Sequence, residues 1–485
     1  MAGVFAVQGF ETVVRSRGPA FLPSDLAPEP QGGLYQGLYK RLRGFILDGV
    51  WPAGTRLPSS RALASDLKVS RNTAILAVEQ LIADGWAESR SRSGVYVCAA
   101  PAVAPAAPLR VAAPLADLPP FALQRPATDL FPAQIWKQLQ GRAWAEIEPQ
   151  RLAGADPAGD AGLREAIARL VCAPRGLRCH PDQILILPTA TAAIDLIAAT
   201  LLHPGDSVLV ENPGRPAVRQ LLAARGARLR DLPVGFSSVD PADGFDDFGT
   251  ARLACVAPTV QFPTCISMAD PLRARLLGWA RSQNGWIIED DRDSDMWFHD
   301  VAPPRPLAAE DSERVLLIGS FNRILFPGLC VAFLVAPLGL VERLRGVHAM
   351  IGGRASLASQ LALREFIGEG HFARHLRRRR QAYAERRAIL LDCLRDHEAV
   401  EADALTSKAG LHVVLDVGAG RAPAVAALLA AARLGGAALD AFAVGAQPGA
   451  HLLLGLGATP ELVRAEAPRV AAAILHDNPD LRDLR

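Results

Sequence analysis

The chain has 485 residues, of which 50% are hydrophobic and 21% are charged, and its net charge is only +2. This length exceeds one ordinary domain, and the composition is typical of globular proteins with a large core, which excludes a largely disordered or fibrous chain. No apolar run approaches the ~18–20 residues that cross a bilayer, so we expect no membrane partner.

The seven cysteines are scattered, odd in number and never spaced as CxxC. This pattern indicates neither a disulfide framework nor a zinc site, so we expect reduced, mostly structural thiols and no bound metal. Residues 1–18 lack the basic start, the continuous apolar stretch and the small-residue cleavage site of a secretory signal. We therefore expect a cytoplasmic protein.

The charge is distributed unevenly along the chain. Residues 31–98 carry nine Lys or Arg against five Asp or Glu, a local charge of +4 that leaves −2 for the remainder. A local basic surplus is typical of a nucleic-acid-binding module that is attached to a nearly neutral body.

Three helices are predicted in this basic region. Residues 34–49 carry apolar residues at helical spacing, and Gly49 is placed to end that helix. Ser59 and Ser70 can each cap a further helix, and the turn between those two helices is about three residues long. This is the spacing of a helix-turn-helix, in which the first turn of the second helix meets base edges.

A small hairpin is predicted at residues 86–99, with Ser93 and Gly94 at its tip and Arg90 and Arg92 beside it. Together with the helices, residues 52–97 resemble the winged helix-turn-helix of the GntR superfamily. The resemblance implies DNA contacts from the short second helix, the start of the recognition helix and the wing tip, with Arg56 on phosphate. The residues at those positions are Arg56, Arg61, Ser70, Arg71, Asn72, Thr73, Ser93 and Gly94. The alternative is a three-helix module with solvated arginines or one that contacts protein.

A spacer and a larger body follow the DNA-binding domain that we assign to residues 32–98. Residues 99–120 contain six prolines and no glycine, which predicts a semi-rigid linker. From residue 121 on, near-continuous apolar runs alternate with helical segments, which predicts a mainly parallel sheet with helices on both faces. The expected strands are 183–187, 207–211, 252–257, 285–290, 314–319 and 331–336.

The predicted fold class is therefore multidomain: a winged helix-turn-helix, an α/β large domain at 121–340 and a smaller α+β lobe at 341–485. The small lobe contains the basic segment 375–387, which we interpret as a solvated helix face rather than as a second DNA site.

Ligands of open parallel sheets bind beyond the carboxyl ends of the strands. The loops there are 188–196, 211–219, 257–264, 289–298 and 319–330. Their order and spacing resemble the aminotransferase-like body of pyridoxal-phosphate fold type I. With the GntR-type module, residues 32–476 resemble the MocR subfamily of bacterial transcriptional regulators, which implies a double-stranded DNA operator as partner and a homodimer.

The resemblance also implies pyridoxal phosphate as cofactor, held by a lysine Schiff base and by a carboxylate on the ring nitrogen. The carboxylate is present as Asp290, but the lysine position is Arg323, and a guanidinium cannot form an imine. None of the four lysines follows a central strand. We therefore predict no catalytic residue and no covalent cofactor, while noncovalent binding stays open.

Further positions depart from the family pattern. They are Thr189, Ala190 and Thr191 in the phosphate loop, Arg215 and Arg292 in place of aromatic residues, Val260 in place of a histidine, and Cys330 in place of an arginine. In one account, Arg215, Arg292 and Arg323 pair with Asp290, Asp291, Asp293 or Asp295 and fill the site. In another account, the arginines form a receptor for a small anionic effector.

The function predicted from the sequence is that of a DNA-binding transcriptional regulator whose aminotransferase-like body serves dimerisation and effector sensing. The alternative is a pyridoxal-phosphate-dependent aminotransferase, or a regulator that responds to this cofactor, with an ancillary DNA module. A pseudoenzyme scaffold without a DNA function is a third class, which the intact sequence Ser70 to Thr73 disfavours.

Overall fold

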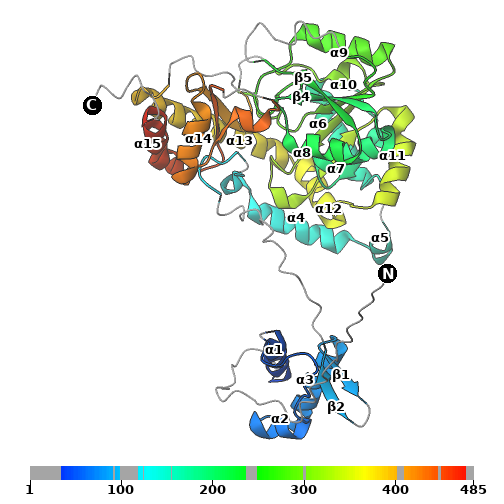
Figure 1. Cartoon of the computed structure of the whole chain (residues 1–485). Helices are drawn as coiled ribbons and strands as arrows, with labels where there is room; N and C mark the ends of the chain where they lie inside the picture. Colours follow the sequence, from blue (N-terminus) through cyan, green and yellow to red (C-terminus); the bar gives the residue numbers. More distant parts are fainter. Residues whose placement is uncertain are drawn as a thin grey trace, which may run out of the picture. The chain divides into compact units, whose positions relative to one another are not determined.

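The computed structural model describes residues 34–47, 49–90, 93–98, 118–123, 125–154, 156–235, 248–298, 302–400, 409–445 and 449–476 (Figure 1). The chain divides into two compact units, residues 1–112 and 113–485. Most of the expected linker, residues 99–117, lies outside the described residues. The boundary expected at residue 340 stays a prediction.

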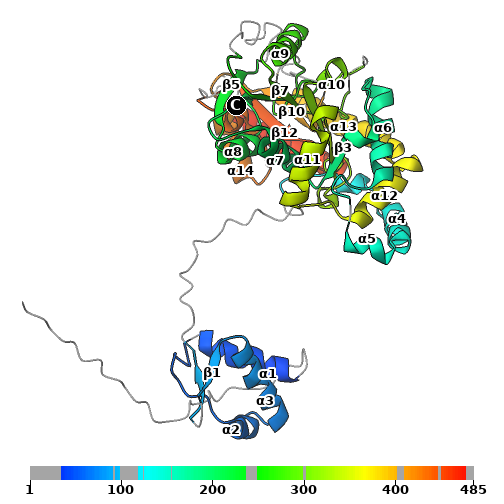
Figure 2. The ribbon, with the colours of Figure 1, turned by 90° about the vertical axis from the view of Figure 1, so that its right-hand side faces the viewer.

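The first unit contains the three predicted helices and the predicted hairpin (Figures 1 and 2). Its elements are α1 (Leu34–Leu47), α2 (Ser60–Asp66), α3 (Arg71–Ala83), β1 (Ala87–Arg90) and β2 (Gly94–Val97). Ser59 Oγ accepts a hydrogen bond from the backbone N–H of Ala62, and Ser70 Oγ accepts one from Thr73. Both predicted caps are thus confirmed, and each satisfies a backbone donor at the start of a helix.

One face of each helix packs into a common core. Leu42 of α1, Leu63 of α2 and Leu81 of α3 are all buried, and they pack around Trp51. The partly buried side chains of Arg43 and Trp86 add a cation–π contact at 4.8 Å. This core holds the helix-turn-helix against the hairpin.

The second unit is built on a seven-stranded sheet in the order β3-β9-β8-β7-β6-β4-β5. The strands are β3 (Ile184–Leu187), β4 (Ser207–Asn212), β5 (Arg228–Pro233), β6 (Leu253–Val256), β7 (Trp286–Asp290), β8 (Val315–Ser320) and β9 (Ala332–Val335). Only β9 runs antiparallel to its neighbours β3 and β8, so the predicted mainly parallel sheet is confirmed. The sequence pattern missed β5, which is an edge strand with charged residues at three of its six positions.

Helices cover both faces of this sheet (Figures 1 and 2). One face packs against α7 (Ala190–Leu201), α8 (Pro216–Ala224) and α11 (Leu338–Ile351). The other packs against α4 (Ala133–Glu146), α6 (Ala161–Arg175), α9 (Asp270–Ser282), α10 (Leu307–Glu310) and α12 (Leu357–Gly368); α5 (Pro149–Ala153) follows α4. Alternate residues of β3 enter opposite cores, as the period of a strand requires.

A smaller antiparallel sheet, in the order β10-β12-β11, forms the second core of this unit. It consists of β10 (His412–Asp416), β11 (Ala437–Ala438) and β12 (His451–Gly455), with helices α13 (His371–Asp396), α14 (Ala422–Ala431) and α15 (Pro460–His476). No helix of the described residues combines the length and hydropathy needed to span a membrane.

The interpretation of 375–387 as a solvated helix face is wrong in part. Arg379 and Arg386 of α13 are 1% and 0% exposed, whereas Arg377 and Arg378 are exposed. The Arg379 guanidinium lies over the ring of Tyr383, at 4.9 Å, and donates to the Arg323 carbonyl oxygen. Long helices can bury arginine stems, so a run of basic letters does not identify the solvated face.

His412 joins the small sheet to the loop after β6, because its Nε2 donates to the Pro263 carbonyl oxygen at 2.7 Å. Burial lowers the pKa of His412 from 6.5 to about 4. The unfolded chain thus binds a proton here before the folded chain does, so the contribution of His412 to stability is complete above pH 6.5 and is lost as the pH falls towards 4.

We expect the free energy of unfolding to fall by about 3 kcal/mol between pH 7 and pH 4 through this group. The variant His412→Gln keeps an N–H donor for Pro263 but cannot titrate, so its pH profile should be flatter by that amount. Urea unfolding at a series of pH values measures both profiles, and identical slopes would contradict this assignment.

Candidate functional site

The predicted DNA contacts of the first unit lie at its surface. The exposed residues are Arg56, Arg61, Ser70, Arg71 and Asn72, and those that are partly buried are Thr73, Ser93 and Gly94. Within the described part of the chain, no carboxylate forms an ion pair with Arg56, Arg61 or Arg71. These three cations are therefore available to phosphates or base edges.

At the start of α3, some of the predicted DNA contacts cap the helix and others are exposed to solvent. Ser70 Oγ accepts from the Thr73 backbone N–H at 3.0 Å and lies 2.8 Å from Thr73 Oγ1. These two hydroxyls therefore complete the first turn of the helix. Arg71 and Asn72 remain exposed on that turn, which is the position from which a recognition helix reads bases.

The wing tip lies against Arg56. Gly94 has a φ of +114°, and a Cβ atom there would lie 2.9 Å from Arg56 Nε, so a side chain at this position would displace the guanidinium. The backbone of Arg56 also forms an antiparallel β-bridge with that of Tyr96 in β2. The structure thus brings Arg56 together with Ser93 and Gly94, while Arg92 lies outside the described residues.

Asp290 lies at the carboxyl end of β7 and is held by two arginines. Arg292 binds it in a bidentate manner, with Nε 2.7 Å from Oδ1 and Nη2 2.5 Å from Oδ2. Arg215, which follows β4 at the start of α8, places its Nε 3.2 Å from Asp290 Oδ2. The carboxylate that would serve a ring nitrogen is therefore already paired within the chain.

Asp293 is the second acid of the cluster and links two of the arginines. Its Oδ2 accepts from Arg215 Nη2 at 2.7 Å, and its Oδ1 lies 2.9 Å from Arg323 Nε. The contact between Asp293 Oδ1 and Arg323 Nε is an ion pair and not a hydrogen bond, and neither of these two atoms has another hydrogen-bond partner. Arg323, at the lysine position, is thus held by electrostatic attraction to Asp293 and not by a directional hydrogen bond.

The arginines stabilise the charged forms of the two aspartates, whereas burial and the neighbouring charges of Arg292 and Arg323 lower the pKa of Arg215. Burial alone would raise the pKa of Asp290, but the charges of Arg292 and Arg215 outweigh it and hold that pKa well below its ordinary value. The same balance, with Arg323 and Arg215 as the cations, lowers the pKa of Asp293. Three arginines and two ionised aspartates carry a formal charge of +1, next to Glu211, whose pKa burial raises to about 7.

A small cavity adjoins two members of the cluster. The cavity beside Arg215 and Asp290, lined also by Phe262 and Glu211, has a volume of about 20 Å³. That is the size of about one water molecule, whereas small-molecule sites measure roughly 300–1,000 Å³. The Arg215 guanidinium lies 4.3 Å above the Phe262 ring, in a space next to Asp290. Asp290 is paired within the chain and Arg323 cannot form an imine, so the residues at this site do not fit pyridoxal phosphate.

The other predicted remnants of the cofactor site do not join the cluster. Thr189 caps α7, where its Oγ1 accepts from the Ala192 N–H at 3.0 Å; Ala190 is buried and Thr191 is partly buried in the same first turn. Cys330 is exposed and has a φ of +53°. These positions flank the site without an ion pair to it.

Three contacts around the site were not predicted. Asp291 pairs with Arg175 of α6, whose Nη1 is 2.7 Å from Asp291 Oδ2 and 2.7 Å from Ser294 Oγ. Asn322 bridges two loops, donating to the Pro188 carbonyl oxygen and accepting from the Val331 N–H. Asp295 lies 4.0 Å from Arg380. Of the four acids considered, Asp290 and Asp293 therefore hold the three arginines.

Comparison with known proteins agrees with this division into two parts. Residues 34–97 match the family of bacterial regulatory proteins of the gntR family, and residues 125–464 match aminotransferase class I and II. The probable rhizopine catabolism regulatory protein MocR of Rhizobium meliloti is 36% identical over 390 residues, which cover 76% of this chain and 78% of that one. The chain belongs to the MocR-type GntR regulators.

Other MocR-type regulators are similar over comparable lengths. TauR, an HTH-type transcriptional regulator of Rhodobacter capsulatus, is 32% identical over 77% of this chain and 82% of its own. PdxR, an HTH-type pyridoxine biosynthesis transcriptional regulator of Corynebacterium glutamicum, is 28% identical over 82% of this chain and 86% of its own.

Solved structures show the fold of the MocR-type body. The α-aminoadipate aminotransferase LysN of Thermus thermophilus is similar with a TM-score of 0.65 and 24% identity, over 75% of this chain and 93% of that one. The kynurenine aminotransferase of Pyrococcus horikoshii has a TM-score of 0.66 at 19% identity, over 74% and 91% of the two chains. The body of this regulator thus has the fold type I aminotransferase architecture, as predicted.

Proposed function

We propose that this protein is a dimeric, DNA-binding transcriptional regulator in the cytoplasm whose aminotransferase-like body performs no transamination. The observation that carries the proposal is the pairing of Arg323, at the lysine position, with Asp293 while Arg215 and Arg292 occupy Asp290. A guanidinium there cannot form the covalent bond on which this class of enzyme depends.

The winged module supports the regulatory half of the proposal. Arg61 and Arg71 project from consecutive helices without a carboxylate partner among the described residues, as DNA-contacting arginines do. In vitro selection of duplexes with the purified protein, combined with an amino-acid-to-keto-acid assay, tests both halves. We expect a specific duplex and no turnover; turnover without specific binding would favour the enzyme with an ancillary DNA module.

The body is where an effector would act, and the charge of the cluster restricts its chemistry. The surplus positive charge favours an anion, and Arg323 is the most exposed of the three arginines, at 25%. An anionic effector that binds Arg323 would compete with Asp293, whose Oδ1 lies 2.9 Å from Arg323 Nε.

The variant Arg323→Lys is expected to remain inactive in transamination. It restores an amine, but Arg215 and Arg292 still occupy Asp290, and the positioning and proton-transfer groups are absent. A weak imine band near about 400–430 nm is expected only at high cofactor concentration. Absorbance and keto-acid formation measure the two effects. Robust multiple turnover would show that Arg323 was the only obstacle.

Dimerisation through the body is supported by exposed apolar side chains on α4, α5 and α11. Trp144, Leu152 and Met350 are 61%, 63% and 80% exposed, which is unusual for large apolar residues that stay in water. We expect Trp144→Glu combined with Met350→Glu to shift the protein to monomers in sedimentation velocity and to weaken operator binding, since linked half-sites are lost.

The matched control for this test is Val444→Glu in the small lobe, where Val444 is 55% exposed. This variant adds a charge to an apolar surface position of similar exposure, and it should leave the dimer unchanged. Dissociation by Val444→Glu alone, or a stable dimer in the double variant, would place the interface elsewhere.

A further inference from the structure

Two cysteines of the body lie in direct contact, away from the arginine cluster. Cys172 is on the last turns of α6, and Cys179 is in the segment that leads to β3. Their sulfur atoms are 3.2 Å apart and both are free thiols. Both side chains are partly exposed, and both line a groove of about 460 Å³ that is open along α6. A small oxidant can therefore reach the pair from solvent.

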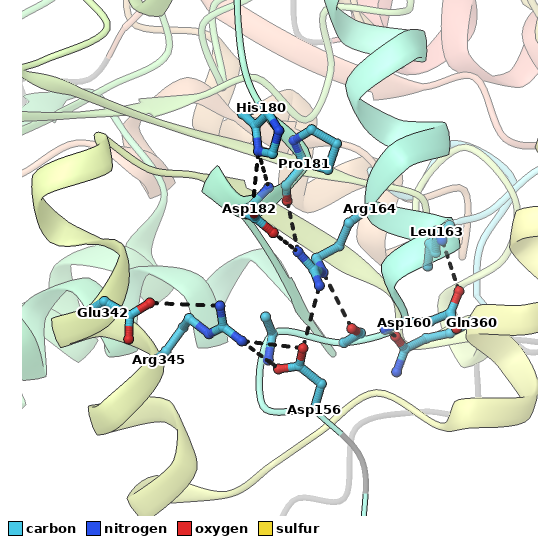
Figure 3. A network of polar contacts seen from close by, with 12 residues as sticks. Asp156, Asp160, Leu163, Arg164, His180, Pro181, Asp182, Glu342, Arg345 and Gln360 are labelled. Carbon is cyan, nitrogen blue, oxygen red and sulfur yellow. Dashed lines mark hydrogen bonds and ion pairs between the residues drawn. The ribbon is translucent and has the colours of Figure 1, made fainter. Parts of the chain in front are cut away.

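The contact is fixed by the surrounding fold rather than left to chance. Arg164 of α6 is 6% exposed and donates from Nη1 to the Pro181 carbonyl oxygen at 3.1 Å and to Asp182 Oδ1 at 3.0 Å (Figure 3). The segment after Cys179 is also closed on itself, because the His180 N–H donates to Gln183 Oε1 and His180 Nδ1 accepts from the Asp182 N–H. These contacts hold residues 179–183 against the helix that carries Cys172.

We propose that Cys172 and Cys179 are an oxidative modification site that forms a reversible intramolecular disulfide with hydrogen peroxide. In the first step, the Cys172 thiolate attacks one peroxide oxygen, the O–O bond breaks, and the released hydroxide takes a proton to become water. In the second step, Cys179 loses its proton and attacks the sulfenic sulfur of Cys172, and the S–O bond breaks to release a second water. Two thiols are oxidised and one peroxide is reduced.

Cys179 is assigned the second role for a physical reason. Burial and its hydrogen bond to Cys172 raise the pKa of Cys179 to about 12, so it stays protonated at neutral pH and is a poor first nucleophile. Its sulfur is nevertheless already in contact with the sulfur that it must attack. The site should therefore respond to sustained oxidant, and low-molecular-weight thiols should reverse the bond.

The disulfide would tighten a turn that also holds the candidate site. Arg175 lies between the two cysteines and binds Asp291 with both Nη atoms, at 2.7 and 2.8 Å, as well as Ser294. The loop that it holds is the one that carries Arg292 and Asp293. Oxidation should therefore reduce the mobility of residues 291–296.

Tryptic mapping without reductant tests the disulfide directly, because cleavage after Arg169, Arg175 and Arg178 separates the two cysteines. After treatment of the full chain with hydrogen peroxide, we expect peptides 170–175 and 179–219 to be linked, and to separate on addition of dithiothreitol. Cys172→Ser and Cys179→Ser should each abolish the linked pair. The control Cys330→Ser, which removes an exposed thiol elsewhere, should retain it.

Two results would overturn the proposal. The first is that Cys172 and Cys179 remain reduced, or reach only sulfinic or sulfonic acid, under oxidant that modifies Cys330. The second is that the linkage forms only between chains. Hydrogen exchange of residues 291–296, compared between reduced and oxidised protein, should become slower; unchanged exchange would overturn the coupling through Arg175.

Discussion

Replacement of Asp290 by alanine is expected to lower the free energy of unfolding by about 3–5 kcal/mol. Arg215 and Arg292 are 15% and 12% exposed, and Asp290 is the ion-pair partner that they share. Removal of this carboxylate leaves two largely buried cations with one acid, Asp293, which is already shared with Arg323. Uncompensated buried charge is among the most destabilising changes known in folded proteins.

Two further variants test whether the loss of stability comes from the uncompensated buried charge. Asp392→Ala removes an exposed ion pair with Arg395 and should change the unfolding free energy by less than about 0.5 kcal/mol. Asp290→Ala combined with Arg292→Leu removes an orphaned cation as well and should recover part of the loss. Urea unfolding followed by circular dichroism measures all three. An Asp290→Ala loss no larger than that of Asp392→Ala would show that the cluster does not hold the site together.

Replacement of Arg71 by alanine is expected to weaken operator binding by about 1–3 kcal/mol, or roughly 5- to 150-fold, without loss of the fold. Arg71 is exposed on the first turn of α3 and has no intramolecular carboxylate partner among the described residues. Arg61→Ala should have an effect in the same range. Fluorescence anisotropy with the selected duplex measures the change.

Lys40→Ala is the matched control for charge. Lys40 is exposed on α1, outside the expected DNA surface, and its removal lowers the net charge by the same amount as Arg71→Ala. Operator affinity should stay nearly unchanged in this variant at moderate salt. Equal effects of Lys40→Ala and Arg71→Ala would mean that only the overall charge of the module matters and that α3 does not read bases.

The sequence predicted the elements whose apolar pattern is continuous or periodic. The three helices, the hairpin and six strands of the large sheet followed from such patterns, because burial of one face or of both faces dictates the spacing. Strand β5 was not predicted because three of its six residues are charged and it lies at the edge of the sheet, where burial imposes less of a pattern.

The sequence also indicated which arginines replaced the cofactor contacts, but not how they pair. Four acids follow one another within residues 290–295, and only the turn after β7 decides that Asp290 and Asp293 face the arginines while Asp291 faces Arg175. The burial of Arg379 and Arg386 could not be predicted from the sequence either, because it depends on which face of α13 packs against the small sheet. Tertiary packing, and not local sequence, determines these ion pairs and which arginines are buried.

The most direct measurement of the central proposal is equilibrium dialysis of pyridoxal phosphate against the full-length protein. We expect no saturable site at micromolar concentration, because Asp290 is paired with Arg215 and Arg292 and the guanidinium of Arg323 cannot form an imine. Saturable binding of one molecule per chain that Asp290→Asn abolishes would contradict it, and would show that the arginine cluster opens to receive the cofactor of the family.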